Sequence, residues 1–300
     1  MVSPGAAISY LRAVMVKKEY SPRCLRLTEH IIGMNPAHYT VWLYRAANIF
    51  AMKLPIPDEI EWLNGVALEY LKNYQIWHHR HLLLDNYYPT IADDPEAVAR
   101  LAASERAFIA QILAEDTKNY HVWSYRSYLI EKLKLWGSTE ELAAIEEMIA
   151  DDVRNNSAWS HRFFLVFSDP SHSNPGVSAT ESDPAAPSEI VDREIAYAQE
   201  KIALAPQNQS PWNYLRGVLV KGGRKLSNVE SFVEGFITGL GREGEEDVKS
   251  THALDLLAEI YAEKGDKEKA DLCLKRLGEK WDQIRKGYWE WRRKCLETGT

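Results

Sequence analysis

The chain has 300 residues, of which 45% are hydrophobic and 26% are charged, so it can bury a sizeable core and is not disordered throughout. Its 36 Lys and Arg against 43 Asp and Glu give a net charge of −7, without the basic surplus that nucleic-acid binding normally uses. We expect no nucleic-acid partner. The three cysteines follow no metal-ligand spacing, and no apolar run approaches the roughly 18 residues of a membrane span. These features favour a cytoplasmic protein without a membrane span.

Apolar side chains recur at helical spacing along nearly the whole chain, and the strict alternation typical of strands never persists. A helix pair over 8–18 and 22–34 comes first. It precedes the first of five blocks that share a tryptophan at their fifth position. The blocks are 38–45, 73–80, 119–126, 155–162 and 208–215, centred on Trp42, Trp77, Trp123, Trp159 and Trp212.

The intervals between these tryptophans are 35, 46, 36 and 53 residues. The two long intervals contain polar insertions around 85–95 and at 168–188, and without these insertions the period lies in the thirties. Each interval also contains a second amphipathic segment, as at 100–115, 140–150 and 190–204. A period of this length with two helices per repeat is typical of helical-hairpin arrays.

We therefore predict an all-α fold, a right-handed superhelical solenoid or crescent of antiparallel helical hairpins, forming a single domain over 1–300. The predicted repeats lie around 22–50, 58–84, 98–133, 139–167 and 189–221, with the insertion 168–188 exposed to solvent and closing helices over 225–297.

Two further columns of the repeat have a structural interpretation. The residue four positions before the tryptophan is Asn in four of the five blocks, which is a preferred helix N-cap; His38 replaces it in the first block. An Arg follows the tryptophan by three positions in four blocks, where it could stack on the indole or bind nearby carbonyls. The fifth block has Leu215 instead and Pro211 before the tryptophan, so we expect an edge repeat with altered packing.

No nucleophile motif, phosphate-binding loop or dinucleotide fingerprint is present. His78 and His81 lie one helical turn apart, but no third ligand follows at suitable spacing, and packing or surface roles are favoured over a metal site. Cations and tyrosines recur just before the tryptophans. They are Lys72, Lys118 and Arg154 five positions upstream, and Tyr39, Tyr74 and Tyr120 three upstream. The pattern alone favours cations that are exposed to solvent and tyrosines that pack between repeats. The alternative is that the cations, at the N-termini of successive helices, form an anion-binding site.

The blocks 72–80, 118–123, 152–159 and 210–215 resemble the repeats of protein prenyltransferase alpha subunits. The resemblance is greatest to the alpha subunit shared by protein farnesyltransferase and protein geranylgeranyltransferase type I, firmly over 10–222. It implies an obligate heterodimer with a beta subunit that holds zinc and most of the isoprenoid pocket. The implied reaction transfers farnesyl or geranylgeranyl from its diphosphate to the cysteine of a C-terminal C-a-a-X sequence, in proteins such as small GTPases. Magnesium would assist the diphosphate in the farnesyl enzyme.

The resemblance also assigns roles to individual residues. Lys72 would bind the isoprenoid diphosphate and stabilise charge on the leaving group, with Tyr120 and His121 close to the same group and Asn119 beside them. Gln75 would bind the C-terminal carboxylate of the peptide, and Tyr74 would lie at the entrance of the same binding site. Lys118 keeps its interpretation as a solvated surface residue, and no metal is expected to bind this chain.

Two alternatives remain open at this point. One is the alpha subunit of Rab geranylgeranyltransferase, which has related repeats and acts on Rab proteins delivered by an escort protein. The other is a non-catalytic helical-repeat scaffold with a concave peptide groove, which would be stable as a monomer.

Overall fold

The computed structural model describes residues 4–242 and 244–298. The chain divides into two compact units, Met1–Leu135 and Trp136–Thr300. Helices dominate both units, and the only strands among the described residues are two of two residues each. The prediction of an all-α array of helical hairpins is confirmed. None of the helices in the described part combines the length and the apolar character that crossing a membrane would require.

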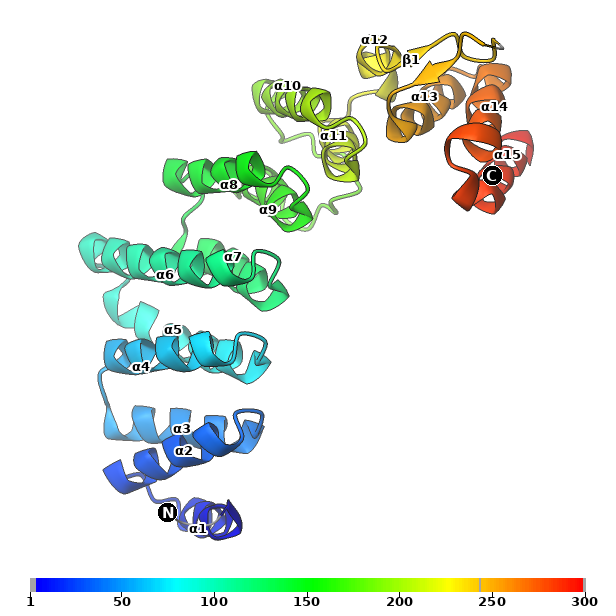
Figure 1. Cartoon of the computed structure of the whole chain (residues 1–300). Helices are drawn as coiled ribbons and strands as arrows, with labels where there is room; N and C mark the ends of the chain where they lie inside the picture. Colours follow the sequence, from blue (N-terminus) through cyan, green and yellow to red (C-terminus); the bar gives the residue numbers. More distant parts are fainter. Residues whose placement is uncertain (1–3, 243, 299–300) are drawn as a thin grey trace. The chain divides into compact units, whose positions relative to one another are not determined.

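The first unit contains seven helices in its described part, and six of them form three hairpins. These hairpins, α2–α3, α4–α5 and α6–α7, follow one another in a row with their internal turns on the same side (Figure 1). The helices are α1 (Pro4–Val16), α2 (Pro22–Met34), α3 (Tyr39–Met52), α4 (Ile56–Glu69), α5 (Tyr74–Ile91), α6 (Pro95–Glu115) and α7 (Tyr120–Leu133).

The second unit continues with the hairpins α8–α9 and α10–α11 and then changes character. A short strand pair follows α12, with Ile237 opposite Val248 and Thr238 opposite Asp247 in antiparallel register. The α-helices are α8 (Thr139–Asp151), α9 (Asn156–Phe167), α10 (Ser188–Leu204), α11 (Gln209–Lys221), α12 (Glu230–Glu234), α13 (Thr251–Glu263), α14 (Lys267–Arg276) and α15 (Lys286–Thr298), with β1 (Ile237–Thr238) and β2 (Asp247–Val248) between α12 and α13. Two-residue strands are too short to produce a periodic signal, which is why the sequence did not reveal them.

The tryptophan column forms the core of the repeats. All five indoles are buried, with relative exposures from 0% at Trp212 to 7% at Trp123. Four of them donate their N–H to the carbonyl six residues earlier, as Trp42 does to Pro36 at 2.8 Å and Trp159 does to Val153 at 2.9 Å. Each bond satisfies the one polar atom of a large apolar side chain and fixes the turn that precedes its helix.

The arginine column follows the prediction only in part, since Arg45 Nη1 donates to the Leu25 carbonyl at 3.3 Å. Only Arg126 lies over its own repeat tryptophan, 5.4 Å from the ring centroid of Trp123. In three other repeats the guanidinium reaches the next helix along the chain, where it forms an ion pair with a buried glutamate and lies over an aromatic ring. The pairs are Arg45–Glu59 at 2.6 Å, Arg80–Glu105 at 2.8 Å and Arg162–Glu194 at 2.7 Å, over Trp62, Phe108 and Tyr197.

Each of these glutamates also binds the side chain twenty positions later. The partners are His79 for Glu59, Tyr125 for Glu105 and Tyr214 for Glu194. A guanidinium removed from water needs a carboxylate, and this carboxylate comes from a neighbouring hairpin. Spacing within one block therefore could not reveal it.

Candidate functional site

The six residues that the resemblance singles out all lie in the first unit, at the internal turns of α4–α5 and α6–α7. These turns lie on the same side of neighbouring hairpins (Figure 1). Lys72 precedes α5, Tyr74 and Gln75 begin α5, Asn119 is the N-cap of α7, and Tyr120 and His121 begin α7.

Two asparagines build these turns, as the cap prediction requires. The side-chain oxygen of Asn73 accepts the Gln75 amide at 2.9 Å, and that of Asn119 accepts the His121 amide at 3.1 Å. The prediction is confirmed again in α9 and α11, whereas His38 provides no side-chain cap for α3. Each cap removes an unsatisfied donor from the first helical turn.

The same asparagines also join one hairpin to the next through their amide nitrogens. Asn119 Nδ2 donates to the carbonyl of Leu71 at 2.9 Å, and Asn73 Nδ2 donates to the carbonyl of Pro36 at 2.7 Å. The start of α7 is therefore held against the residue that precedes Lys72. This second role was not predicted, because a backbone carbonyl acceptor leaves no trace in the sequence.

Lys72, like Lys118 on the next turn, is exposed. Its side chain is 83% exposed, and its Nζ lies 3.7 Å from Asp116 Oδ2, on the turn that leads into α7. An exposed ion pair at this distance contributes little to stability, so the ammonium can exchange Asp116 for an external anion. The N-terminal ends of α5 and α7 add positive potential beside it. Asp116 was not among the predicted residues.

The aromatic and amide groups differ in how accessible they are. Tyr74 and Tyr120 are 60% and 77% exposed, and the Tyr120 ring meets the His121 ring edge-on at 5.8 Å. Gln75 is buried, although its side-chain amide has no hydrogen-bond partner among the described residues. Asn119 is also buried, and both ends of its amide are used within the protein.

A groove of about 510 Å³ adjoins this edge of the first unit. One wall comes from Pro36 and Ala37 in the turn between α2 and α3. The other comes from the end of α4 and the following turn, including Leu68, Lys72 and Tyr74. The groove thus combines mainly apolar walls with one cation, Lys72, and one carboxylate, Glu69.

No three His, Cys, Asp or Glu side chains come together as a possible metal site in the described part of the chain. Of the three histidines at positions 78, 79 and 81, two have contacts within the described part of the chain. His79 binds Glu59 at 2.9 Å, and the His81 ring packs against the Tyr128 ring at 4.1 Å.

Comparisons with known proteins agree with the repeat structure. The family model for the protein prenyltransferase alpha subunit repeat matches residues 56–87, 102–133, 138–169 and 191–221. Each matched segment contains one of the last four tryptophan blocks.

Two relatives match nearly the whole chain. The protein farnesyltransferase/geranylgeranyltransferase type-1 subunit alpha of Candida albicans is 36% identical, covering 94% of this chain and 85% of that protein. The subunit of the same name from Dictyostelium discoideum is 32% identical, covering 95% and 82%. Among solved structures, a chain of Candida albicans protein geranylgeranyltransferase-I complexed with GGPP matches with a TM-score of 0.86 and 32% identity, covering 99% of this chain and 92% of that one.

Proposed function

The chain belongs to the family of protein farnesyltransferase/geranylgeranyltransferase type-1 alpha subunits, and we propose that it acts as the alpha subunit of a heterodimeric protein prenyltransferase. In the proposed reaction, the thiolate of a C-a-a-X cysteine attacks C1 of farnesyl or geranylgeranyl diphosphate. A thioether forms and diphosphate leaves. The observation that carries the proposal for this site is the weakly paired ammonium of Lys72, on a turn that Asn119 joins to the start of α7 through the Leu71 carbonyl.

The role proposed for Lys72 is electrostatic. As the carbon–oxygen bond breaks, negative charge accumulates on the diphosphate, and a positioned ammonium stabilises that charge more in the transition state than in the ground state. Tyr120 and His121 begin the neighbouring helix and are proposed to donate to the same diphosphate. The Asn119 cap fixes the start of their helix, which would limit the ordering that binding requires.

The peptide substrate is proposed to bind at the start of α5. Gln75 would donate its side-chain amide to the C-terminal carboxylate, and Tyr74 would lie beside it. The lack of an internal hydrogen-bond partner for the Gln75 amide among the described residues supports this role. Asn119 would act mainly by holding the two turns together, and direct contact between Asn119 and substrate stays a prediction.

The residues described in this chain form no group of three potential metal ligands. We propose that zinc is held by the beta subunit, where it would lower the pKa of the substrate thiol, and that magnesium accompanies the diphosphate. The proposed partners are that beta subunit and C-a-a-X proteins such as small GTPases, with the cytoplasm as the expected location.

The test is to co-express the chain with a farnesyltransferase-type beta subunit and measure farnesyl transfer to a C-a-a-X peptide. Lys72→Ala should lower kcat by about 10- to 1,000-fold while the heterodimer stays intact. Lys118→Ala is the matched control, since Lys118 has the same place in the next repeat, and its effect should stay within about 2-fold. If the two substitutions change kcat equally, Lys72 has no specific role in the site. A heterodimer that is inactive on every C-a-a-X peptide would refute the proposed function.

A further inference from the structure

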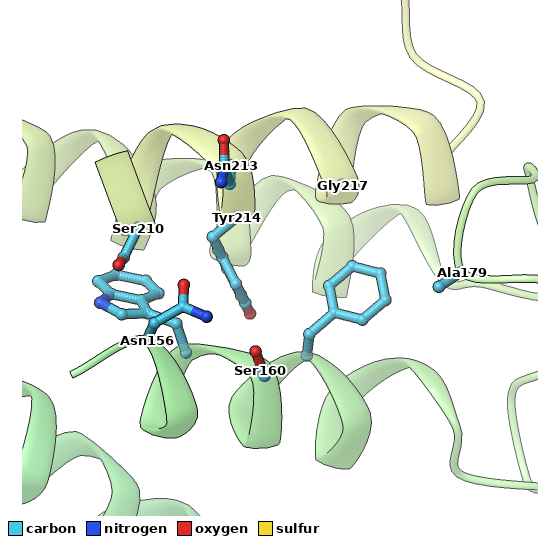
Figure 2. A pocket seen from close by; sticks show the side chains of 9 residues that line it. Asn156, Ser160, Ala179, Ser210, Asn213, Tyr214 and Gly217 are labelled. Carbon is cyan, nitrogen blue, oxygen red and sulfur yellow. The ribbon is translucent and has the colours of Figure 1, made fainter. Parts of the chain in front are cut away.

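A second pocket lies in the second unit, between α9 and α11, the second helices of two consecutive hairpins. It has a volume of about 270 Å³, and Ala179 from the insertion 168–188 contributes to its wall (Figure 2). All the residues that line it are uncharged. It shares none of its residues with the groove beside Lys72.

The floor of this α9–α11 pocket presents carbon atoms. Trp159 and Tyr214 contribute ring faces, because their polar atoms are bonded elsewhere: the indole N–H to Val153 at 2.9 Å and the phenol O–H to Glu194 at 2.6 Å. Phe163 lies against α11 at Gly217, where a Cβ would come within 3.1 Å of the phenyl ring. Glycine in a helix interior costs about 0.5–1 kcal/mol relative to alanine, and here it leaves room for the Phe163 ring.

The rim offers hydrogen bonds that the chain itself does not use. Asn156 and Ser160 are exposed on α9 and face α11 (Figure 2), and Asn213 lines the pocket from α11. None of these three side chains has a hydrogen-bond partner among the described residues. A dry floor with a neutral, unsatisfied rim suits an apolar group flanked by polar but uncharged atoms.

The insertion is fixed in place rather than free in solvent. Asp183 is buried and accepts hydrogen bonds from the Asn174 amide at 2.9 Å and the Ala185 amide at 3.0 Å. Lys221, the buried last residue of α11, donates to the carbonyl of Ser178 at 3.1 Å. The residue before Ala179 is thus tied to the helix on the other side of the pocket. The prediction of an exposed polar excursion holds for most of the segment but missed this anchor.

The size of the pocket restricts its occupant. Small-molecule and cofactor sites occupy roughly 300–1,000 Å³, so about 270 Å³ is better suited to one large side chain than to a separate ligand. Single apolar side chains buried in a pocket with a polar rim are the usual anchors of protein interfaces. The relatives that match this chain are named as alpha subunits, which implies a second polypeptide.

We propose that the α9–α11 pocket receives one large apolar side chain from an uncharged segment of the beta subunit, whose backbone bonds to Asn156 and Ser160. This proposal rests on the proposed function. It makes the second unit an anchor for the partner, separate from the chemistry at Lys72. It also gives the insertion a role, because the segment forms one wall of the pocket.

The experiment measures the dissociation constant of the full-length chain with a farnesyltransferase-type beta subunit. Ser160→Trp should fill the pocket and weaken the heterodimer at least about 10-fold, and Asn156→Ala should weaken it about 2- to 10-fold. The matched control is Ala196→Trp, which places the same side chain in a pocket of about 280 Å³ on α10 and should leave the affinity unchanged. Circular dichroism and thermal melts of the free chains verify that all variants fold.

The outcomes separate the two proposals. If the wild-type chain binds the beta subunit and Ser160→Trp and Asn156→Ala bind it equally well, the pocket has no part in the interface and the inference is wrong. If the wild-type chain binds no beta subunit, the proposed function and the inference both fail. If sedimentation shows that the wild-type chain alone is a dimer that Ser160→Trp dissociates, the occupant is a second copy and the inference is overturned.

Discussion

Replacing Glu194 by alanine should destabilise the second unit far more than replacing Glu146, although both carboxylates bind the same guanidinium. Arg162 donates to Glu194 at 2.7 and 3.1 Å and to Glu146 at 2.9 Å. The two glutamates differ in their access to water, since the Glu194 side chain is 0% exposed and that of Glu146 is 46% exposed. Glu194 also accepts the buried hydroxyl of Tyr214 at 2.6 Å.

The magnitudes follow from this difference in burial. Glu194→Ala leaves a guanidinium and a phenol without their buried acceptor, and breaking a buried ion pair costs about 3–5 kcal/mol. Glu146→Ala removes a half-exposed partner and should cost at most about 1 kcal/mol. For a unit of this size, about 2–4 °C in Tm per kcal/mol gives a fall of about 6–20 °C for Glu194→Ala.

The lowered pKa of Glu194 also indicates that this carboxylate stabilises the fold. Burial by itself would raise this pKa, but the hydrogen bonds from Arg162 and Tyr214 outweigh it, and the pKa lies below its ordinary value. A carboxyl whose folded pKa is depressed stabilises the fold above its unfolded pKa, and the contribution is lost as the pH falls through the folded pKa. The cost of Glu194→Ala should therefore shrink in acid.

Urea unfolding at neutral pH, followed by tryptophan fluorescence and calorimetry, measures both costs. The double variant Arg162→Met with Glu194→Leu should recover part of the loss, since an apolar pair of similar volume removes the unpaired charge but leaves the Tyr214 hydroxyl without its acceptor. The reasoning would be refuted by a Glu194→Ala cost no larger than that of Glu146→Ala, or by a double variant as unstable as the single one.

Three further predictions concern other parts of the chain. Asn119→Ala should lower the free energy of unfolding by about 2 kcal/mol, because the helix cap and the bond to the preceding turn are lost together; denaturant titration measures it, and a loss below about 0.5 kcal/mol would contradict the linking role. Burial lowers the pKa of His79 below its ordinary 6.5, despite the opposing bond to Glu59, so the unfolded chain takes up the proton more readily. The contribution of neutral His79 to the free energy of unfolding should therefore be fully present above about pH 6.5 and be lost as the pH falls below it. A His79→Gln variant whose free energy of unfolding falls equally steeply in acid would disprove this origin. Burial raises the pKa of Cys273 to about 12, so a thiol reagent at pH 8 should label the partly exposed Cys295 much faster; mass spectrometry of the labelled peptides would contradict this if both reacted alike.

The repeat and the helix starts could be predicted from the order of residues alone. Trp159 and its counterparts occur once per hairpin, and in four of the five blocks an Asn lies four positions before the tryptophan, so this spacing is local to the start of one helix. The capping side chain acts on amides two or three residues away, as Asn119 does on His121. Such short-range geometry depends only on neighbouring residues and can be predicted from their order.

Contacts between hairpins, in contrast, depend on how the helices pack. Arg162 pairs with a glutamate 32 residues away, Asn119 bonds to a carbonyl 48 residues away, and Lys221 holds a loop that begins more than 40 residues earlier. These separations vary with the lengths of turns and insertions, so no fixed period encodes them. Buried charges and amides take the partners that packing places within reach, because leaving them unsatisfied away from water costs more than any local preference provides.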